Sequence, residues 1–338
     1  MNKKETIIAI LLILILQFGT LHATFSIQNG VKVVATISAI ASIIGPILTN
    51  KDNLAVLLPS NVEPHSFSLD PLTVQKALEA DILVSSGHIG WEKQLENQVL
   101  EKGKIIFDPL KQLNSSLILL NSPNGGKNIH GYWLDPENVK LIASEFAKKM
   151  EIMNPLMSQT YEENLQKYIN EIESLKSFAL DSVKKKGLYG DKVVIGFYEE
   201  QYVAESFGLN PVEVLAGDEE NLEISPQKMD TIRKGLLNGT ITYLVVSEIA
   251  LELPLNDYIT KLSEETGKTV CYVRTLDIPG IYDFRELYTF NLGNILNDGN
   301  PTNSSSYVLA PDVYLELLGA LLILNIVFGY IVFARVKK

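Results

Sequence analysis

The stretch "PLMSQTYEENLQKYINEIESLKSFALDSVKKK", residues 155–186, lies near the middle of a chain of 338 residues. It contains no glycine, and its only proline is its first residue. Apolar residues recur in it at the spacing of a helix, at Leu165, Tyr168, Ile169, Ile172, Leu175 and Phe178. The pattern predicts a single helix of roughly 30 residues and about 45 Å.

On both sides of this stretch, short β-rich runs alternate with helical patterns. Candidate strands cover residues 31–38, 54–59, 82–87 and 104–109 before it, and residues 192–198, 242–248 and 269–274 after it. Such alternation is typical of βαβ units and parallel sheets. The predicted fold class is therefore α/β, with two lobes whose parallel β-sheets are flanked by helices, residues 24–154 and 188–297, joined by one long rigid helix, residues 155–187. Two lobes held in this way would form a cleft that binds a ligand with little hinge bending.

Both ends of the chain are apolar. Residues 1–23 have a basic start and an apolar centre, which predicts a signal peptide or an N-terminal anchor. Residues 313–335 are long and apolar enough to cross a hydrocarbon core of about 30 Å, which predicts a C-terminal transmembrane anchor. Basic residues follow this anchor and place the C-terminus in the cytoplasm. The body is then expected on the extracellular face of the cell membrane, with residues 298–312 as a flexible stalk.

Composition excludes several classes of function. The net charge of −11 argues against a nucleic-acid binder, which needs a basic surface to neutralise phosphates. A single cysteine, Cys271, excludes an intrachain disulfide framework and a cysteine-rich zinc or iron–sulfur site. The chain has no HExxH, nucleophile elbow, P-loop, or GxGxxG following a strand, so we do not expect an enzyme.

Two of the four histidines lie in segments with restricted backbones. His65 belongs to "LLPSNVEPHSFSLDP", residues 57–71, where prolines stiffen a loop that follows a predicted strand. His130 precedes "WLDPENV", in which Asp135 can cap a helix that has Pro136 at its first position. Both histidines could converge on one cleft. Neutral imidazoles suit zinc, and also manganese when carboxylates complete the coordination.

These segments resemble the extracellular solute-binding proteins of zinc and manganese ABC importers. In that family, a loop similar to residues 57–71 supplies the first metal-binding histidine, and a segment similar to "NIHGYWLDPENVKLIASEFAKKM" supplies the second. The segment "QKALEADILVSSGHIGWE" also fits, and the resemblance extends over about residues 31–297. It implies His65 and His130 as ligands, zinc or manganese as the transported ion, and an ABC-importer permease as the membrane partner.

The second lobe departs from the family at the two remaining ligand positions, where Phe197 and Arg274 stand. A guanidinium cannot ligate a cation. Three interpretations are open: the carboxylates of Glu200, Glu199 and Asp277 complete the metal site; Arg274 pairs with one of them and closes a site without metal; or Arg274 and the histidines bind an anion or a chelated metal.

The expected function is that of a membrane-anchored extracellular solute-binding protein that captures zinc or manganese for an ABC importer. The alternative is a divergent family member with a lost or altered metal site, which acts as an adhesion or scaffold protein or binds an anion or a chelated metal. His88, in "SSGHIGWE", is interpreted as a polar loop residue near the cleft rim. His22 belongs to the signal segment.

Overall fold

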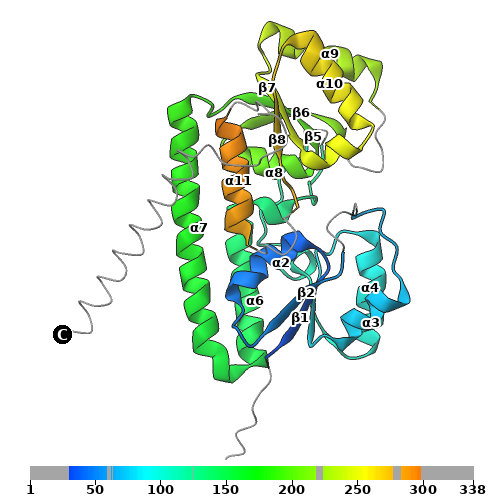
Figure 1. Cartoon of the computed structure of the whole chain (residues 1–338), viewed down its shortest axis with the longest axis vertical. Coiled ribbons are helices and arrows are strands. Elements are labelled where there is room, and N and C mark those ends of the chain that lie inside the picture. The colour runs from blue at the N-terminus through cyan, green and yellow to red at the C-terminus, as the bar shows by residue number, and fades with distance from the viewer. Residues whose placement is uncertain are drawn as a thin grey trace, which may run out of the picture. The chain divides into compact units, whose positions relative to one another are not determined.

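The computed structural model describes residues 30–58, 62, 64–123, 125–217, 224–276 and 283–297. In its first lobe, the four described strands are parallel and form a sheet in the order β2-β1-β3-β4; β1 and β2 are labelled in Figure 1. The strands are β1 (Lys32–Ala35), β2 (Asn53–Val56), β3 (Ile82–Val84) and β4 (Ile105–Phe107). Helices α2 (Ser38–Ile44), α3 (Pro71–Glu79), α4 (Gly90–Glu101), α5 (Pro109–Gln112) and α6 (Pro136–Met153) connect and cover them, with the 3₁₀ turns η1 (Gly45–Ile47) and η2 (Tyr132–Leu134).

The second lobe repeats this plan with a parallel sheet in the order β6-β5-β7-β8. Its described strands are β5 (Lys192–Phe197), β6 (Asn210–Gly217), β7 (Tyr243–Ser247) and β8 (Val270–Val273). Its described helices are α8 (Glu199–Ser206), α9 (Pro226–Asn238), α10 (Leu255–Thr266) and α11 (Phe284–Leu296), with the 3₁₀ turn η4 (Glu248–Glu252). The predicted two-lobe α/β fold with parallel sheets is therefore confirmed.

Strand β6 was not among the predicted strands. It contains Pro211, and its pairing with β5 shifts register twice. A proline cannot donate a hydrogen bond to a sheet and is confined to edge strands or bulges. Because β6 lies at the edge of its sheet, both features are tolerated there.

The second sheet is buried on both faces. Along β5, Val193 and Ile195 belong to the core that continues into the first lobe and α7, whereas Val194 and Phe197 belong to a separate core under α9 and α10. Successive side chains of a strand point to opposite faces, as those of Val193, Val194 and Ile195 do, and the register irregularity between Ile195 and Phe197 places Phe197 on the same face as Val194. One face of this sheet therefore packs with the joining helix and the first lobe.

The joining helix α7 (Ser158–Lys186) has 29 residues and follows the 3₁₀ turn η3 (Pro155–Met157). It ends at Gly187, whose φ of 80° is the left-handed conformation that commonly terminates helices. Most of the predicted apolar stripe is buried or half-buried, but Phe178 is 44% exposed, and the buried face continues through Ala179 and Val183 instead. Helices α6 and α11 pack against α7 (Figure 1).

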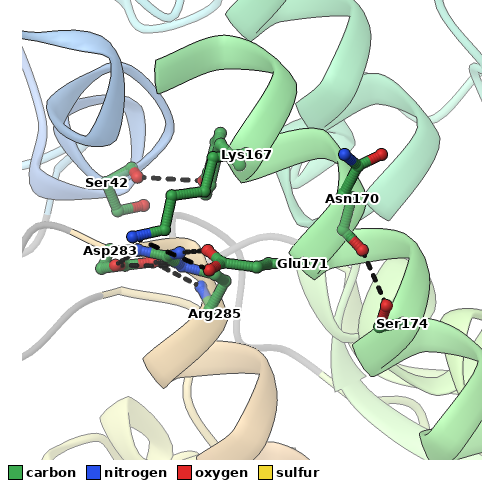
Figure 2. A network of polar contacts seen from close by, with 8 residues as sticks. Ser42, Lys167, Asn170, Glu171, Ser174, Asp283 and Arg285 are labelled. Atoms are coloured by element: carbon green, nitrogen blue, oxygen red, sulfur yellow. Dashed lines mark hydrogen bonds and ion pairs between the residues drawn. The ribbon is translucent and has the colours of Figure 1, made fainter. Parts of the chain in front are cut away.

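An ion-pair cluster fastens α11 to α7 near the middle of the long helix (Figure 2). The Arg285 guanidinium pairs with Glu171 of α7 and with Asp283, whose Oδ1 lies 2.8 Å from the arginine Nε. It also lies over the Tyr168 ring, at 5.1 Å from the centroid. The Tyr168 hydroxyl donates a hydrogen bond of 3.3 Å to the Ser42 carbonyl of α2. We call Arg285, Asp283, Glu171 and Tyr168 the α7–α11 clasp.

Within the described ranges, no helix is both long enough and apolar enough to cross a membrane. The predicted signal segment, stalk and C-terminal anchor, residues 1–23, 298–312 and 313–335, lie outside these ranges.

Candidate metal centre

Three histidines of the first lobe come together in the described structure. The ring centroids of His65 and His88 are 5.6 Å apart, those of His65 and His130 are 5.7 Å apart, and those of His88 and His130 are 5.2 Å apart. One nitrogen from each ring lies within 4.8 Å of the others, a spacing that can accommodate one shared metal ion. We call His65, His88 and His130 the histidine cluster.

His65 is positioned by the loop after β2. The indole Nε1 of Trp91, at the start of α4, donates a 2.9 Å hydrogen bond to the Pro64 carbonyl. The Phe67 ring packs edge-on against Trp91, with centroids 5.0 Å apart. The loop is therefore anchored immediately before and two residues after His65.

His130 is positioned by the second lobe as well as the first. Its backbone N–H donates to Asn128 Oδ1 at 2.9 Å, and the buried Asn128 amide donates to the Tyr198 carbonyl at 2.8 Å. The next residue, Gly131, has φ 83°, and a Cβ there would lie 2.8 Å from the Glu199 Cα. A glycine is needed because the backbone of the His130 loop lies against the start of α8.

His88 follows β3 in a loop, as expected, and the structure places its ring in the histidine cluster. Its Nδ1 lies 2.8 Å from Ser86 Oγ, and its ring packs on Trp133 with centroids 4.9 Å apart. Burial, followed by the proximity of His130 and His65, holds the pKa of His88 well below its usual range, so the ring is neutral near pH 7. A neutral imidazole is the form that ligates metals.

The parallel topology of the sheet is a feature from which His88 could have been predicted as a candidate ligand. His65 follows β2 and His88 follows β3, and both strands flank β1 in the sheet. Ligand sites of parallel α/β sheets lie beyond the carboxyl ends of the strands. His88 directly follows the strand predicted at residues 82–87, so this rule marks it as a candidate ligand.

Of the predicted carboxylates, Glu199 lies beside the histidine cluster. Its Oε1 is 3.7 Å from His130 Nδ1. Together with His65 and His88 it lines a cavity of about 20 Å³, whose other walls include Ile249 and Thr275. A space of this size is large enough for an ion or a water.

The other predicted carboxylates have different positions. Glu200 is fully buried, and its two oxygens accept the backbone N–H groups of Phe197 and Ser247. Burial raises its pKa well above the usual range, against the lowering effect of these hydrogen bonds. It joins the ends of β5 and β7 and is not part of the histidine cluster. Asp277 lies outside the described residues.

Phe197 and Arg274, at the two substituted ligand positions, make contacts within the second lobe. Phe197 is 1% exposed and lies in the separate core of that lobe. The Arg274 Nε donates to Glu248 Oε2 at 2.6 Å, and its guanidinium carbon lies 4.0 Å from the centroid of the Phe290 ring. Arg274 thus has an acidic partner in its own lobe, Glu248, which was not among the carboxylates suggested from the sequence. Glu248 directly follows β7, the strand beside β8.

Known proteins similar to this chain share its two-lobe architecture. The family model described as "Zinc-uptake complex component A periplasmic" matches residues 33–297. The manganese ABC transporter substrate-binding lipoprotein PsaA of Streptococcus pneumoniae is 24% identical over 264 residues, which cover 75% of this chain and 85% of PsaA.

Two solved structures share the fold. FpvC of Pseudomonas aeruginosa in complex with Mn²⁺ aligns with a TM-score of 0.67 and 16% identity, over 81% of this chain and 100% of FpvC. A Zn(II)-bound mutant variant of AdcAII from Streptococcus pneumoniae aligns with a TM-score of 0.65 and 18% identity, over 80% of this chain and 98% of that one.

Proposed function

Since the chain belongs to the zinc-uptake complex component A family, whose members are non-enzymatic solute-binding proteins of ABC importers, we propose that it captures a zinc or manganese ion for such an importer. The proposed ligands are His65, His88 and His130, with Glu199 as the fourth. The observation that carries the proposal is the convergence of three imidazole nitrogens within 4.8 Å of one another.

The proposed ligand set compensates for the two substituted positions. His88 supplies from the first lobe a nitrogen ligand in place of one expected from the second lobe. Glu199 supplies a carboxylate from the first turn of α8, close in the chain to the buried Phe197. Three histidines and one carboxylate form a ligand set that is common for zinc and is used by other divalent metals.

The cavity and the arginine favour a bare cation over the other interpretations. A chelated metal needs a pocket of about 300 Å³ or more, whereas the cavity beside the histidine cluster has about 20 Å³. Glu248 neutralises the Arg274 charge at 2.6 Å, which weakens its repulsion of a cation.

A metal titration of the chelator-stripped chain tests the proposal. We expect one zinc or manganese ion per chain by elemental analysis. At an ion concentration of 100 times the dissociation constant, binding should stabilise the fold by about 2.7 kcal/mol and raise the melting temperature. His65→Ala, His88→Ala and His130→Ala should each remove most of this shift. If the wild-type chain shows no metal-dependent shift, the proposal is wrong.

We further propose that the body lies outside the cell and is tethered by residues 313–335, with an importer permease as its partner. The relatives named as lipoproteins support a membrane-associated location. Protease treatment of intact cells should degrade the body and leave a short C-terminal fragment. Protection of the body would contradict this topology.

A further inference from the structure

Resting on the metal site proposed above, we infer that Ser86 and Glu92 are positioning residues that fix the proton of His88 on Nδ1 and leave Nε2 as its metal ligand. The three side chains form a continuous chain of hydrogen bonds. Ser86 Oγ lies 2.6 Å from Glu92 Oε2 and 2.8 Å from His88 Nδ1. Ser86 and Glu92 are both fully buried.

The direction of these hydrogen bonds follows from the donors around Glu92. Its Oε1 accepts the Ser86 backbone N–H at 2.9 Å, and its Oε2 accepts the Ile89 backbone N–H at 3.2 Å. Backbone N–H groups can only donate, so each carboxylate oxygen already acts as an acceptor. The Thr36 hydroxyl also donates a hydrogen bond to Oε1. A carboxylate surrounded by donors in this way is satisfied as the ionised, acceptor-only form.

The serine hydroxyl has a single proton, which settles the state of the imidazole. An ionised Glu92 requires that Ser86 donate its proton to Oε2. The Ser86 oxygen is then left with lone pairs only, so the 2.8 Å contact with His88 requires a proton on Nδ1. In the neutral ring, Nε2 therefore has the lone pair that a metal needs.

This chain of contacts ties the ligand to rigid elements. Thr36 follows β1, Ser86 follows β3, and Glu92 lies in the first turn of α4. Groups that orient a metal-ligating histidine through its other nitrogen typically change metal affinity by about 10–100-fold when they are removed. Ser86 and Glu92 would thus support a histidine whose ring nitrogen completes the cluster.

The first test needs neither a Ser86 variant nor a metal. Histidine-labelled ¹⁵N NMR of the chelator-stripped full chain reports which ring nitrogen is protonated, and the His88 signals are assigned by their loss in His88→Ala. We expect His88 to be protonated on Nδ1. Protonation on Nε2 would overturn the inference whether or not the chain binds metal. Failure of the positioning role of Ser86 and Glu92 is therefore distinguishable from failure of the proposed function.

The second test measures zinc affinity in variants of Ser86. Ser86→Ala should weaken zinc binding about 10-fold or more and allow both His88 tautomers, while Ser86→Thr, which keeps the hydroxyl, should restore the Nδ1–H tautomer and most of the affinity. Ser42→Ala is the matched control, because Ser42 is also a buried serine but bonds to the Ala39 carbonyl within α2. Unchanged zinc affinity and an unchanged tautomer in Ser86→Ala would refute the positioning role.

Discussion

The substitution Gly131→Ala tests how closely the two lobes approach each other at the site. A Cβ added there would lie 2.8 Å from the Glu199 Cα and 3.0 Å from the Glu199 carbonyl oxygen. Both atoms belong to the backbone of α8, so no side-chain rotation can relieve the contact. In Gly131→Ala, either the loop of His130 or the start of α8 must move.

The expected cost has two parts. A left-handed φ of 83° costs a non-glycine residue about 1–2 kcal/mol. Forcing an extra methyl into a packed contact costs about 1–3 kcal/mol. The free energy of unfolding of metal-free Gly131→Ala should therefore fall by about 2–5 kcal/mol.

The variant Gly187→Ala separates the conformational cost of a left-handed φ from the cost of the close contact. Gly187 has φ 80°, but a Cβ there would meet no atom within 4 Å, so this variant should show only the conformational cost. Urea unfolding of both variants, with unchanged m-values, gives the difference directly. Gly131→Ala should also weaken zinc binding, since separating the loop from α8 separates His130 from Glu199, whereas Gly187→Ala should not. Equal destabilisation by the two variants would refute the close contact.

Three other predictions follow from the site. Zinc should bind at least about tenfold more tightly than manganese in a competition titration, because three imidazoles suit zinc better than manganese; preferential manganese binding would imply further oxygen ligands. Glu199→Gln should weaken zinc binding, but less than His130→Ala, and calorimetry that finds no change would remove Glu199 from the ligand set. Arg274→Gln should lower the free energy of unfolding by about 1–3 kcal/mol, because it leaves the half-buried Glu248 without the 2.6 Å partner; an unchanged urea midpoint would show that water replaces the guanidinium.

The lobes and the joining helix could be predicted because their sequence patterns are local. Strands β5 and β7 are continuous apolar runs, and α7 has a regular apolar stripe. Helix α2 was not predicted, because its sequence has no regular pattern of this kind. Its residues from Ala39 to Ile44 are all buried, so it has no polar face and no helical period, and its isoleucines favour strands.

The site could be predicted only in part because its members are brought together by topology. His65 and His130 lie in stretches whose prolines and caps mark them out, and both lie in the cluster. The partner of Arg274 depends on which strand lies beside β8, and that strand is β7. The pairing of β7 with β8 brings Glu248 to the arginine, a residue that sequence proximity did not suggest.

The α7–α11 clasp has a consequence for the order of folding. Glu171 and Arg285 are separated by 114 positions, and all of β5 to β8 lie between them in the chain. Closing such a loop from an unfolded chain costs about 4 kcal/mol in entropy by the logarithmic relation for loop closure. The cost falls once the second sheet has formed and brought the ends of the segment together. The clasp should therefore close late, after the second lobe is compact, and act mainly by slowing unfolding.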